Sequence, residues 1–443
     1  MTDPVDAPVE SKFVFRWISI ASALSLAAAV VTIASVWGRR VEKKNVDIKL
    51  GAPPLVGTLD WRPTLGILPA IALAVTVLII GPYLSARLSM RRIVGLSALM
   101  GTLFTFAVAA SDGFSRILDP VVHPTEYWAN LADLPGAGQM LHKFASRPFL
   151  RNYSVHLKGH PPGFILLLKG LAAVGLGRPW VAGALSYVGV AMMVGGVLVT
   201  VRHVVGETAA RRCAPFLVLA PFTMWMGTSA DAFFAGVAAV AVALVTLSLE
   251  CRGRWAFGLA AISGLLFGFL LFLTYAAATF LAVPACVAVS AYRTPLRRRL
   301  VLALTAGAGV AAVVAGFASL GFWWIAGLKN TNWFYWNGTA QFRPWRFFAF
   351  SNLGALIVAV GPAVLAGLVS LRRTKIWILA GSALVCISFA TASQYSKGEV
   401  ERIWILFYPW LVTAVAVLPA RRIWLAAQAT LVIVLQVWLI SKW

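Results

Sequence analysis

Charged residues are scarce in this 443-residue chain, at 12% of the total against about a quarter in a typical soluble protein. No polar stretch is long enough to form a soluble domain. Hydrophobic residues make up 60% of the chain, in blocks of about 17–25 residues, the length that crosses a bilayer as a helix. The composition excludes an ordinary soluble enzyme and predicts an all-α polytopic membrane protein.

Cysteines and acidic residues are also few. No CxxC pair occurs, so neither a zinc site nor a disulfide framework is predicted. Asp and Glu number 15 against 38 Lys and Arg, for a net charge of +23. Such a charge can indicate nucleic-acid binding. Here the basic residues form short clusters between apolar blocks, as in cytoplasmic loops, and this pattern excludes nucleic acid as a partner.

The N-terminus has no signal-peptide pattern. Residues 2–12, TDPVDAPVESK, carry three acids and one lysine where a signal peptide has a basic region. The apolar run over 13–37 is also too long for a signal. We expect this run to stay as the first span, with a cytoplasmic N-terminus.

About thirteen spans are predicted, and the apolar segment 161–177 is expected to be a short interfacial helix because Gly and Lys interrupt it. The predicted spans are 13–37, 64–86, 91–111, 180–201, 213–228, 230–249, 255–273, 276–292, 300–326, 347–371, 376–393, 403–420 and 423–441.

Loop charge predicts the orientation. Short basic loops hold half of the Lys and Arg residues and are placed in the cytoplasm by the positive-inside rule. The loops 38–63, 112–179, 327–346 and 394–402 then face outward, with GRRVEKK (38–44) as a basic exception. Three regions result: an N-terminal transmembrane hairpin (1–90), a core that includes loop 112–179 (91–292) and C-terminal helices (293–443).

Few ionisable residues lie in the middle of the predicted spans, which argues against an ion-coupled transporter. They gather instead at the predicted outer ends. Asp112 ends the third span, Asp231 begins the sixth, and Lys397, Glu399, Glu401 and Arg402 precede the twelfth. A site at the outer membrane face is therefore predicted.

Asp112, in AASDGFSRILDP, is either a polar helix end or a general base that removes a proton from an acceptor hydroxyl. A low dielectric would help to tune its pKa. Asp119 and Glu126 are the alternative bases in the same loop.

The stretch YSVHLKGHPPGFILLLKG (153–170) sets His156 and His160 four residues apart. A metal pair on a helix is disfavoured, because Gly159 stands between the histidines, two prolines follow them, and no Glu lies between them. Pro161 and Pro162 instead predict a helix start. His160 and Lys158 would then lie at a helix N-terminus, which suits a phosphate.

Four other basic residues are candidates for phosphate binding. Arg402 and Lys397 either pair with Glu399 and Glu401 or hold a lipid-linked phosphate. The aromatic-rich loop 327–346 adds Arg343 and Arg346 and is typical of an interfacial segment.

This order of features resembles the GT-C superfamily of integral-membrane glycosyltransferases. There a span leads into a large extracytoplasmic loop that has an acidic residue near its start and closes with an HPP- or KPP-like motif before a juxtamembrane helix. Asp112 and His160–Pro161–Pro162 stand at these positions here, and TSADAFFAGVAAV places Asp231 in the later Asp-small-aromatic segment. The likeness covers about 90–290, and the rest only by topology.

The resemblance implies transfer of a sugar, mannose or arabinose above all, from a polyprenyl-phosphate donor to an envelope glycan or glycolipid hydroxyl outside the plasma (inner) membrane. Compact mannosyl-, arabinosyl- and aminoarabinosyltransferases are similar in shape. Several such families have Asp-Glu where this chain has Asp112–Gly113, so Asp119 and Glu126 stay open as bases. A direct attack would invert the anomeric centre. Asp231 and Glu401 would contact substrate, and some relatives bind a divalent cation.

Two other functions stay open. A transporter or flippase of a lipid-linked precursor would also need basic residues near the interface but no Asp112. A polyprenyl-dependent transferase or ligase could use histidine chemistry at His156 or His160.

Overall fold

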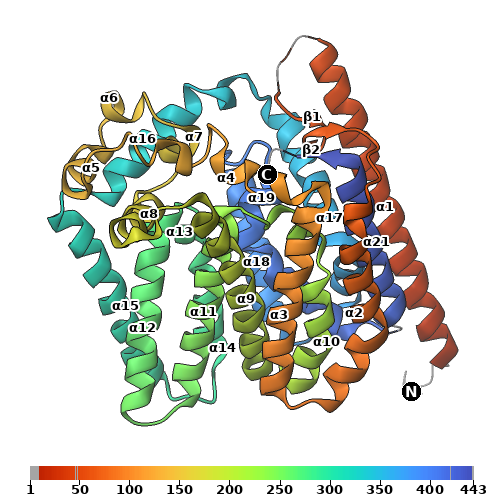
Figure 1. Cartoon of the computed structure of the whole chain (residues 1–443). Coiled ribbons are helices and arrows are strands. Elements are labelled where there is room, and N and C mark those ends of the chain that lie inside the picture. Colours follow the sequence, from red (N-terminus) through yellow and green to blue (C-terminus); the bar gives the residue numbers. More distant parts are fainter. Residues whose placement is uncertain (1–8, 45, 47, 420, 442–443) are drawn as a thin grey trace.

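The computed structural model of the protein describes residues 9–44, 46, 48–419 and 421–441. The first eight residues, to which the prediction of a cytoplasmic N-terminus belongs, lie outside this range. Figure 1 shows long helices side by side and a layer of short helices at one end of the bundle, called the loop end below.

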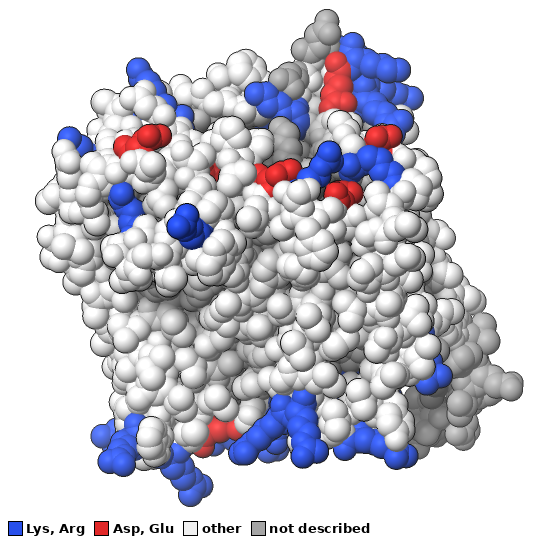
Figure 2. Space-filling model, viewed as in Figure 1, with Lys and Arg blue, Asp and Glu red and all other residues white. Residues whose placement is uncertain are grey.

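The protein is an α-helical multi-spanning membrane protein, as predicted from composition. Eight helices in the described residues are long and apolar enough to cross a membrane. Figure 2 shows Lys and Arg at both ends of one face, with a broad, nearly uncharged belt between them. The eight are α1 (Val9–Lys43), α2 (Leu68–Arg87), α3 (Met90–Ala109), α9 (Pro179–Val204), α11 (Ala230–Glu250), α12 (Arg254–Leu273), α15 (Leu296–Ser319) and α17 (Trp345–Ser370).

The predicted count of thirteen spans is not confirmed, because five of the predicted stretches are short, interrupted or less apolar. One is a pair of helical segments, Val400–Leu406 and Tyr408–Val417, bent by 74° and able to count as a ninth span. The five contain α10 (Glu207–Val218) with η6 (Pro221–Trp225), α13 (Ala277–Phe280) with α14 (Ala282–Ser290), α18 (Ile376–Ala392), the bent pair α19 (Val400–Ile403), η8 (Trp404–Leu406), α20 (Tyr408–Leu411) and η9 (Val412–Val417), and α21 (Arg421–Trp438).

Helix α11 is the central helix of the bundle. Its most apolar window is 78% buried, against 6% for α15. Glycines bring α9 and α11 together, since a Cβ at Gly189 would lie 2.3 Å from the Ala232 carbonyl oxygen and one at Gly236 would lie 2.5 Å from the Gly189 carbonyl oxygen. Small residues allow this backbone approach in membrane helices. The contact fixes α11, and with it Asp231 in its first turn.

The predicted loop 112–179 is folded into short helices at the loop end (Figure 1). The helix expected after Pro161 and Pro162 is present and starts at Gly163. The loop contains η2 (Ala110–Asp112), η3 (Phe114–Arg116), α4 (Asp119–Val122), η4 (Trp128–Asn130), α5 (Ala137–Phe144), α6 (Arg147–Leu150), α7 (Val155–Gly159), α8 (Gly163–Leu171) and η5 (Ala172–Leu176), and α16 (Trp324–Trp336) and η7 (Thr339–Phe342) belong to the later loop.

The segment between α1 and α2 packs against the rest of the protein at the loop end. Its strands β1 (Gly51–Ala52) and β2 (Leu55–Val56) form a hairpin, and β3 (Thr58–Leu59) pairs with β4 (Leu439–Ile440) near the C-terminus. A separate apolar cluster joins this segment to α17 through Phe347 and Phe348. The short η1 (Leu65–Ile67) then leads into α2.

The α9–α11 contact yields a stability prediction. Gly236→Ala places a methyl group against the α9 backbone, and overpacking of this kind costs about 1–3 kcal/mol. We expect a lower apparent unfolding temperature in detergent. Gly258→Ala in α12 is the control, because a Cβ there meets nothing within 4 Å. Equal unfolding temperatures for the two variants would contradict the close contact.

Candidate active site

A buried charged network lies at the loop end around Arg402, whose side chain is 5% exposed. Arg402 Nη1 lies 3.3 Å from Glu126 Oε1, and Nε lies 3.5 Å from Asp231 Oδ2. Arg402 Nη2 lies 2.8 Å from His156 Nε2. The loop that contains Glu126 and His156, the start of α11 and the α19 segment therefore meet at one guanidinium. This guanidinium pairs with two carboxylates at once.

Local backbone features place two members of the network. Asp231 stands in the first turn of α11, where Ser229 Oγ accepts a hydrogen bond from the Asp231 backbone N–H at 3.3 Å. A helix N-terminus favours a carboxylate. Arg402 follows Gly398 and Glu399, whose φ angles of 86° and 61° are left-handed and turn the chain sharply into α19. The turn lies between α18 and the bent pair.

His156 takes part as a neutral hydrogen-bond acceptor. Its Nδ1 bonds the carbonyl oxygen of Thr125, so Nδ1 carries the proton and Nε2 accepts from Arg402. Burial lowers the pKa of His156 well below its ordinary value, and the neighbouring Arg402 cation lowers it further. The ring stacks on that of His160, with centroids 5.7 Å apart, and both rings contact Tyr127.

Glu126 has a chemically useful protonation state. Burial raises the pKa of its carboxyl from 4.5 to about 7, against the opposing effect of the Arg402 charge. Asp231 adds a further upward push. A carboxylate with a pKa near the working pH can accept and release a proton readily. The Glu126 and Asp231 side chains are 14% and 15% exposed, against 5% for Arg402.

The other two candidate bases have different surroundings. Asp112, in η2, is 30% exposed and lies 3.7 Å from the guanidinium of Arg62. Asp119 begins α4 and is exposed. Of the three acids considered as the base, Glu126 is the one that pairs with Arg402. The roles of Asp112 and Asp119 stay predictions.

Lys397 and Arg343 are buried in contacts between loops. Arg343 donates from Nε to the Ile48 carbonyl at 3.1 Å, donates from Nη1 to the Lys397 carbonyl, and pairs with Glu399 at 3.4 Å. The Lys397 ammonium lies 4.4 Å from the centre of the Trp336 ring. These contacts give both cations a structural part in holding together the loops at the loop end.

Glu401 is completely buried beside Arg402 in the chain. Its Oε1 accepts a hydrogen bond from the Val56 backbone N–H at 2.8 Å. The carboxylate thereby ties the β1–β2 hairpin to α19, the helix that carries Arg402. A direct contact of Glu401 with substrate stays a prediction.

The remaining predicted ligands lie nearer the surface. Arg346, at the start of α17, is exposed, and Lys158 is partly exposed with its ammonium 5.8 Å from the centre of the Phe334 ring. His160 lies beside the network through its stack on His156. Tyr127, which touches both histidines, was missed in the sequence because no motif marks it. Its position directly after the candidate base Glu126 is the one feature of the sequence that could have pointed to it.

The described residues offer no recognisable metal centre. No group of three or more His, Cys, Asp or Glu side chains among them is arranged to hold an ion.

Comparisons with known proteins give one structural likeness. No protein-family model and no curated protein matches the chain. The crystal structure of ArnT from Cupriavidus metallidurans in the apo state aligns over 64% of this chain at 17% sequence identity, with a TM-score of 0.39. The alignment covers 54% of that protein, so this chain matches about half of its length.

The network predicts a strong dependence on Arg402. Arg402→Gln leaves two buried carboxylates without their cation, and breaking a buried pair in this way costs about 3–5 kcal/mol. We expect a clear fall in the apparent unfolding temperature, and a partial recovery in Arg402→Gln/Asp231→Asn. The exposed Arg346→Gln serves as the control. Strictly additive effects of the Arg402 and Asp231 changes would contradict the pairing.

Proposed function

We propose that the protein is a glycosyltransferase that moves a sugar from a polyprenyl-phosphate donor to a hydroxyl group of an envelope glycan or glycolipid. The proposal rests on one observation above all, the Glu126–Arg402–Asp231 network at the loop end of a membrane-spanning bundle. The network combines a carboxylate of near-neutral pKa with a buried cation. Membrane-embedded transfer from a phosphate-linked donor needs both groups.

The reaction would proceed by direct displacement. The acceptor oxygen attacks the anomeric carbon, the bond from that carbon to the phosphate oxygen breaks, and the acceptor proton passes to Glu126 as general base. The leaving phosphate takes the bonding electrons and is stabilised by Arg402. One displacement inverts the anomeric centre, and no nucleotide is required.

Arg402 links the two tasks. A phosphate that reaches the guanidinium from the carboxylate side competes with Glu126 for it. Once Glu126 loses this partner, its carboxylate is available to the acceptor hydroxyl. Asp231, held at 3.5 Å on Nε, keeps the guanidinium in place during the exchange. Donor binding would thus prepare the base.

We place the site on the outer face of the plasma (inner) membrane, following the loop charges. The catalytic machinery then extends beyond the predicted core of 91–292, because Arg402 comes from the C-terminal region. Mannose and arabinose are the sugars to test first, because the chain resembles the compact mannosyl- and arabinosyltransferases of the GT-C superfamily.

The first functional prediction compares two bases. Purified protein in detergent is incubated with radiolabelled polyprenyl-phosphate mannose or arabinose and an envelope-lipid fraction. Glu126→Gln should lower transfer by about 10²–10⁴-fold, the usual worth of a general base. Asp112→Asn, the matched control, should keep most of the activity.

The reverse order, with Asp112→Asn inactive and Glu126→Gln active, would move the base to Asp112. Loss in neither variant would leave Asp119 as the acid to test. Tight donor binding without transfer by wild-type protein would favour a flippase, and a larger loss in His156→Ala than in Glu126→Gln would favour histidine chemistry.

The second functional prediction concerns pH. The base acts as its carboxylate, and its pKa is about 7. The ratio kcat/KM, which reports the enzyme without donor, should therefore be low at pH 6, reach half its maximum near pH 7, and level off above about pH 8 as the carboxylate form becomes dominant. Initial rates across this range measure the profile. A rate independent of pH between 6 and 8 would contradict the role of Glu126.

A further inference from the structure

The basic end of α1 is unused by the proposed reaction. Arg39, Arg40, Lys43 and Lys44 are exposed where α1 ends, at the same end of the bundle as the charged network (Figures 1 and 2). Outward-facing loops normally avoid such clusters. A feature that departs from the positive-inside pattern invites a specific explanation.

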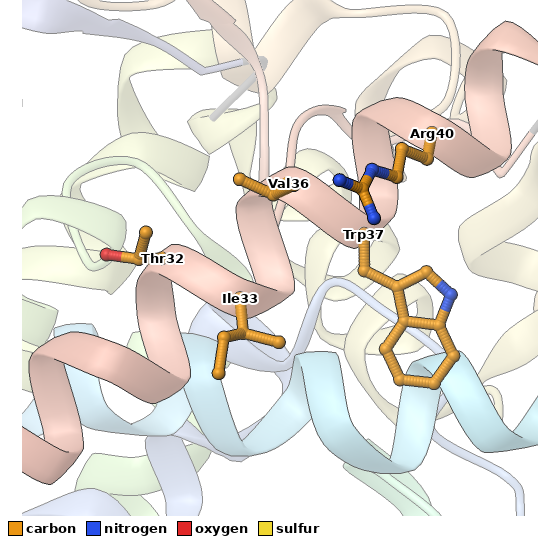
Figure 3. A pocket seen from close by; sticks show the side chains of 5 residues that line it. All are labelled: Thr32, Ile33, Val36, Trp37 and Arg40. Atoms are coloured by element: carbon orange, nitrogen blue, oxygen red, sulfur yellow. The ribbon is translucent and has the colours of Figure 1, made fainter.

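A hollow lies along α1 directly before this cluster. Among the described residues, five side chains of this one helix line it, and Figure 3 shows them as sticks. Ile33 and Val36 are 52% and 44% exposed, and both are apolar. The ring of Trp37 packs on Phe347 and Phe350 of α17, at centroid distances of 5.5 and 6.0 Å, and so fixes one wall. The lining residues are Thr32, Ile33, Val36, Trp37 and Arg40.

Arg40 stands at the charged end of the hollow. In Figure 3 its guanidinium turns back toward Trp37. Among the residues that the structure describes, no hydrogen bond or ion pair engages the Arg40 side chain. The nearby acid Glu42 is already an acceptor for the Gly51 backbone N–H at 3.1 Å. An apolar groove that ends in an available cation is complementary to an amphiphile with a negative head.

The place of the hollow indicates which amphiphile binds. The most apolar window of α1 is 17% buried, so this helix faces lipid rather than the bundle interior. From Thr32 to Arg40 the helix rises about 12 Å, enough for the upper part of an acyl chain. The four clustered cations match a headgroup that lies flat in the interface.

We propose that this face of α1 is a binding site for an anionic glycerophospholipid. One acyl chain lies over Ile33 and Val36, and the phosphate pairs with Arg40, with Arg39 and Lys43 beside it. The site is independent of sugar transfer and holds whether or not the protein is a glycosyltransferase. The bound lipid would anchor α1 and, through Trp37, its contact with α17.

A crosslinking experiment tests this site locally. Val36→p-benzoylphenylalanine is introduced into the full-length protein in bilayers of equal parts phosphatidylglycerol and phosphatidylcholine. After irradiation, mass spectrometry identifies the captured lipid. We expect capture of phosphatidylglycerol to exceed that of phosphatidylcholine. Adding Arg40→Gln should lower this ratio about fivefold, since a basic residue near an anionic surface is worth about 1 kcal/mol.

Two controls make the result specific. Arg372→Gln, an exposed change in the loop between α17 and α18, should leave the ratio unchanged. The same probe at Ile79, which is 57% exposed on α2, should capture both lipids equally. Equal capture at Val36, or a ratio unaffected by Arg40→Gln, would overturn the proposal. Displacement of the phospholipid by equimolar polyprenyl phosphate would also overturn it and assign the hollow to the donor's carrier.

Discussion

Burial of the Arg402 guanidinium is the constraint on which the loop end depends. A desolvated cation is very costly unless charge and hydrogen bonds compensate for it. Glu126 and Asp231 supply the charge, and His156 supplies a neutral acceptor. His156 belongs to α7, Asp231 to α11, Arg402 to α19, and Glu126 to the loop after α4. Their contacts therefore fix these four segments relative to one another. Glu401, bonded to Val56, extends this order to the β1–β2 hairpin.

The same burial also sets the protonation behaviour of Glu126. Removing water raises the pKa of Glu126 to about 7, and Arg402 keeps it from rising further. A surface carboxylate would stay ionised and would be a weak base at neutral pH. Under the proposed function, the network would serve both stability and reactivity through one interaction, and a bound phosphate would disturb both.

Much of the fold could be predicted from the sequence because lipid imposes a simple rule. Long apolar stretches became the eight long helices, and Pro161 and Pro162 did precede a new helix at Gly163. Prolines interrupt some of the five predicted spans that are not confirmed. Pro221 begins a 3-10 turn after α10, and Pro409 lies just after the 74° bend. The average hydropathy of a stretch of residues does not reveal where a proline breaks its helix.

The site could be predicted only in part, because contacts over long separations decide it. Arg402 and Asp231 lie together at one end of the bundle, where the sequence placed them, and the structure adds which acid pairs with Arg402. That acid, Glu126, is 276 positions away in the chain. From the sequence, Lys397 and Arg343 were candidates for phosphate binding. In the structure, Arg343 donates to the carbonyl oxygen of Lys397 and to that of Ile48, which lies 295 positions earlier in the chain. The spacing of residues in the sequence does not predict contacts over such separations.

The central claim is that Glu126 titrates near neutral pH and shares Arg402 with the donor's phosphate. Infrared difference spectroscopy of the protonated carboxyl band, assigned by its loss in Glu126→Gln, measures this directly. We predict an apparent pKa of about 7, and a further rise when polyprenyl phosphate is added and takes over Arg402. A band that titrates near the ordinary value of 4.5, or one that polyprenyl phosphate leaves unchanged, would contradict the account.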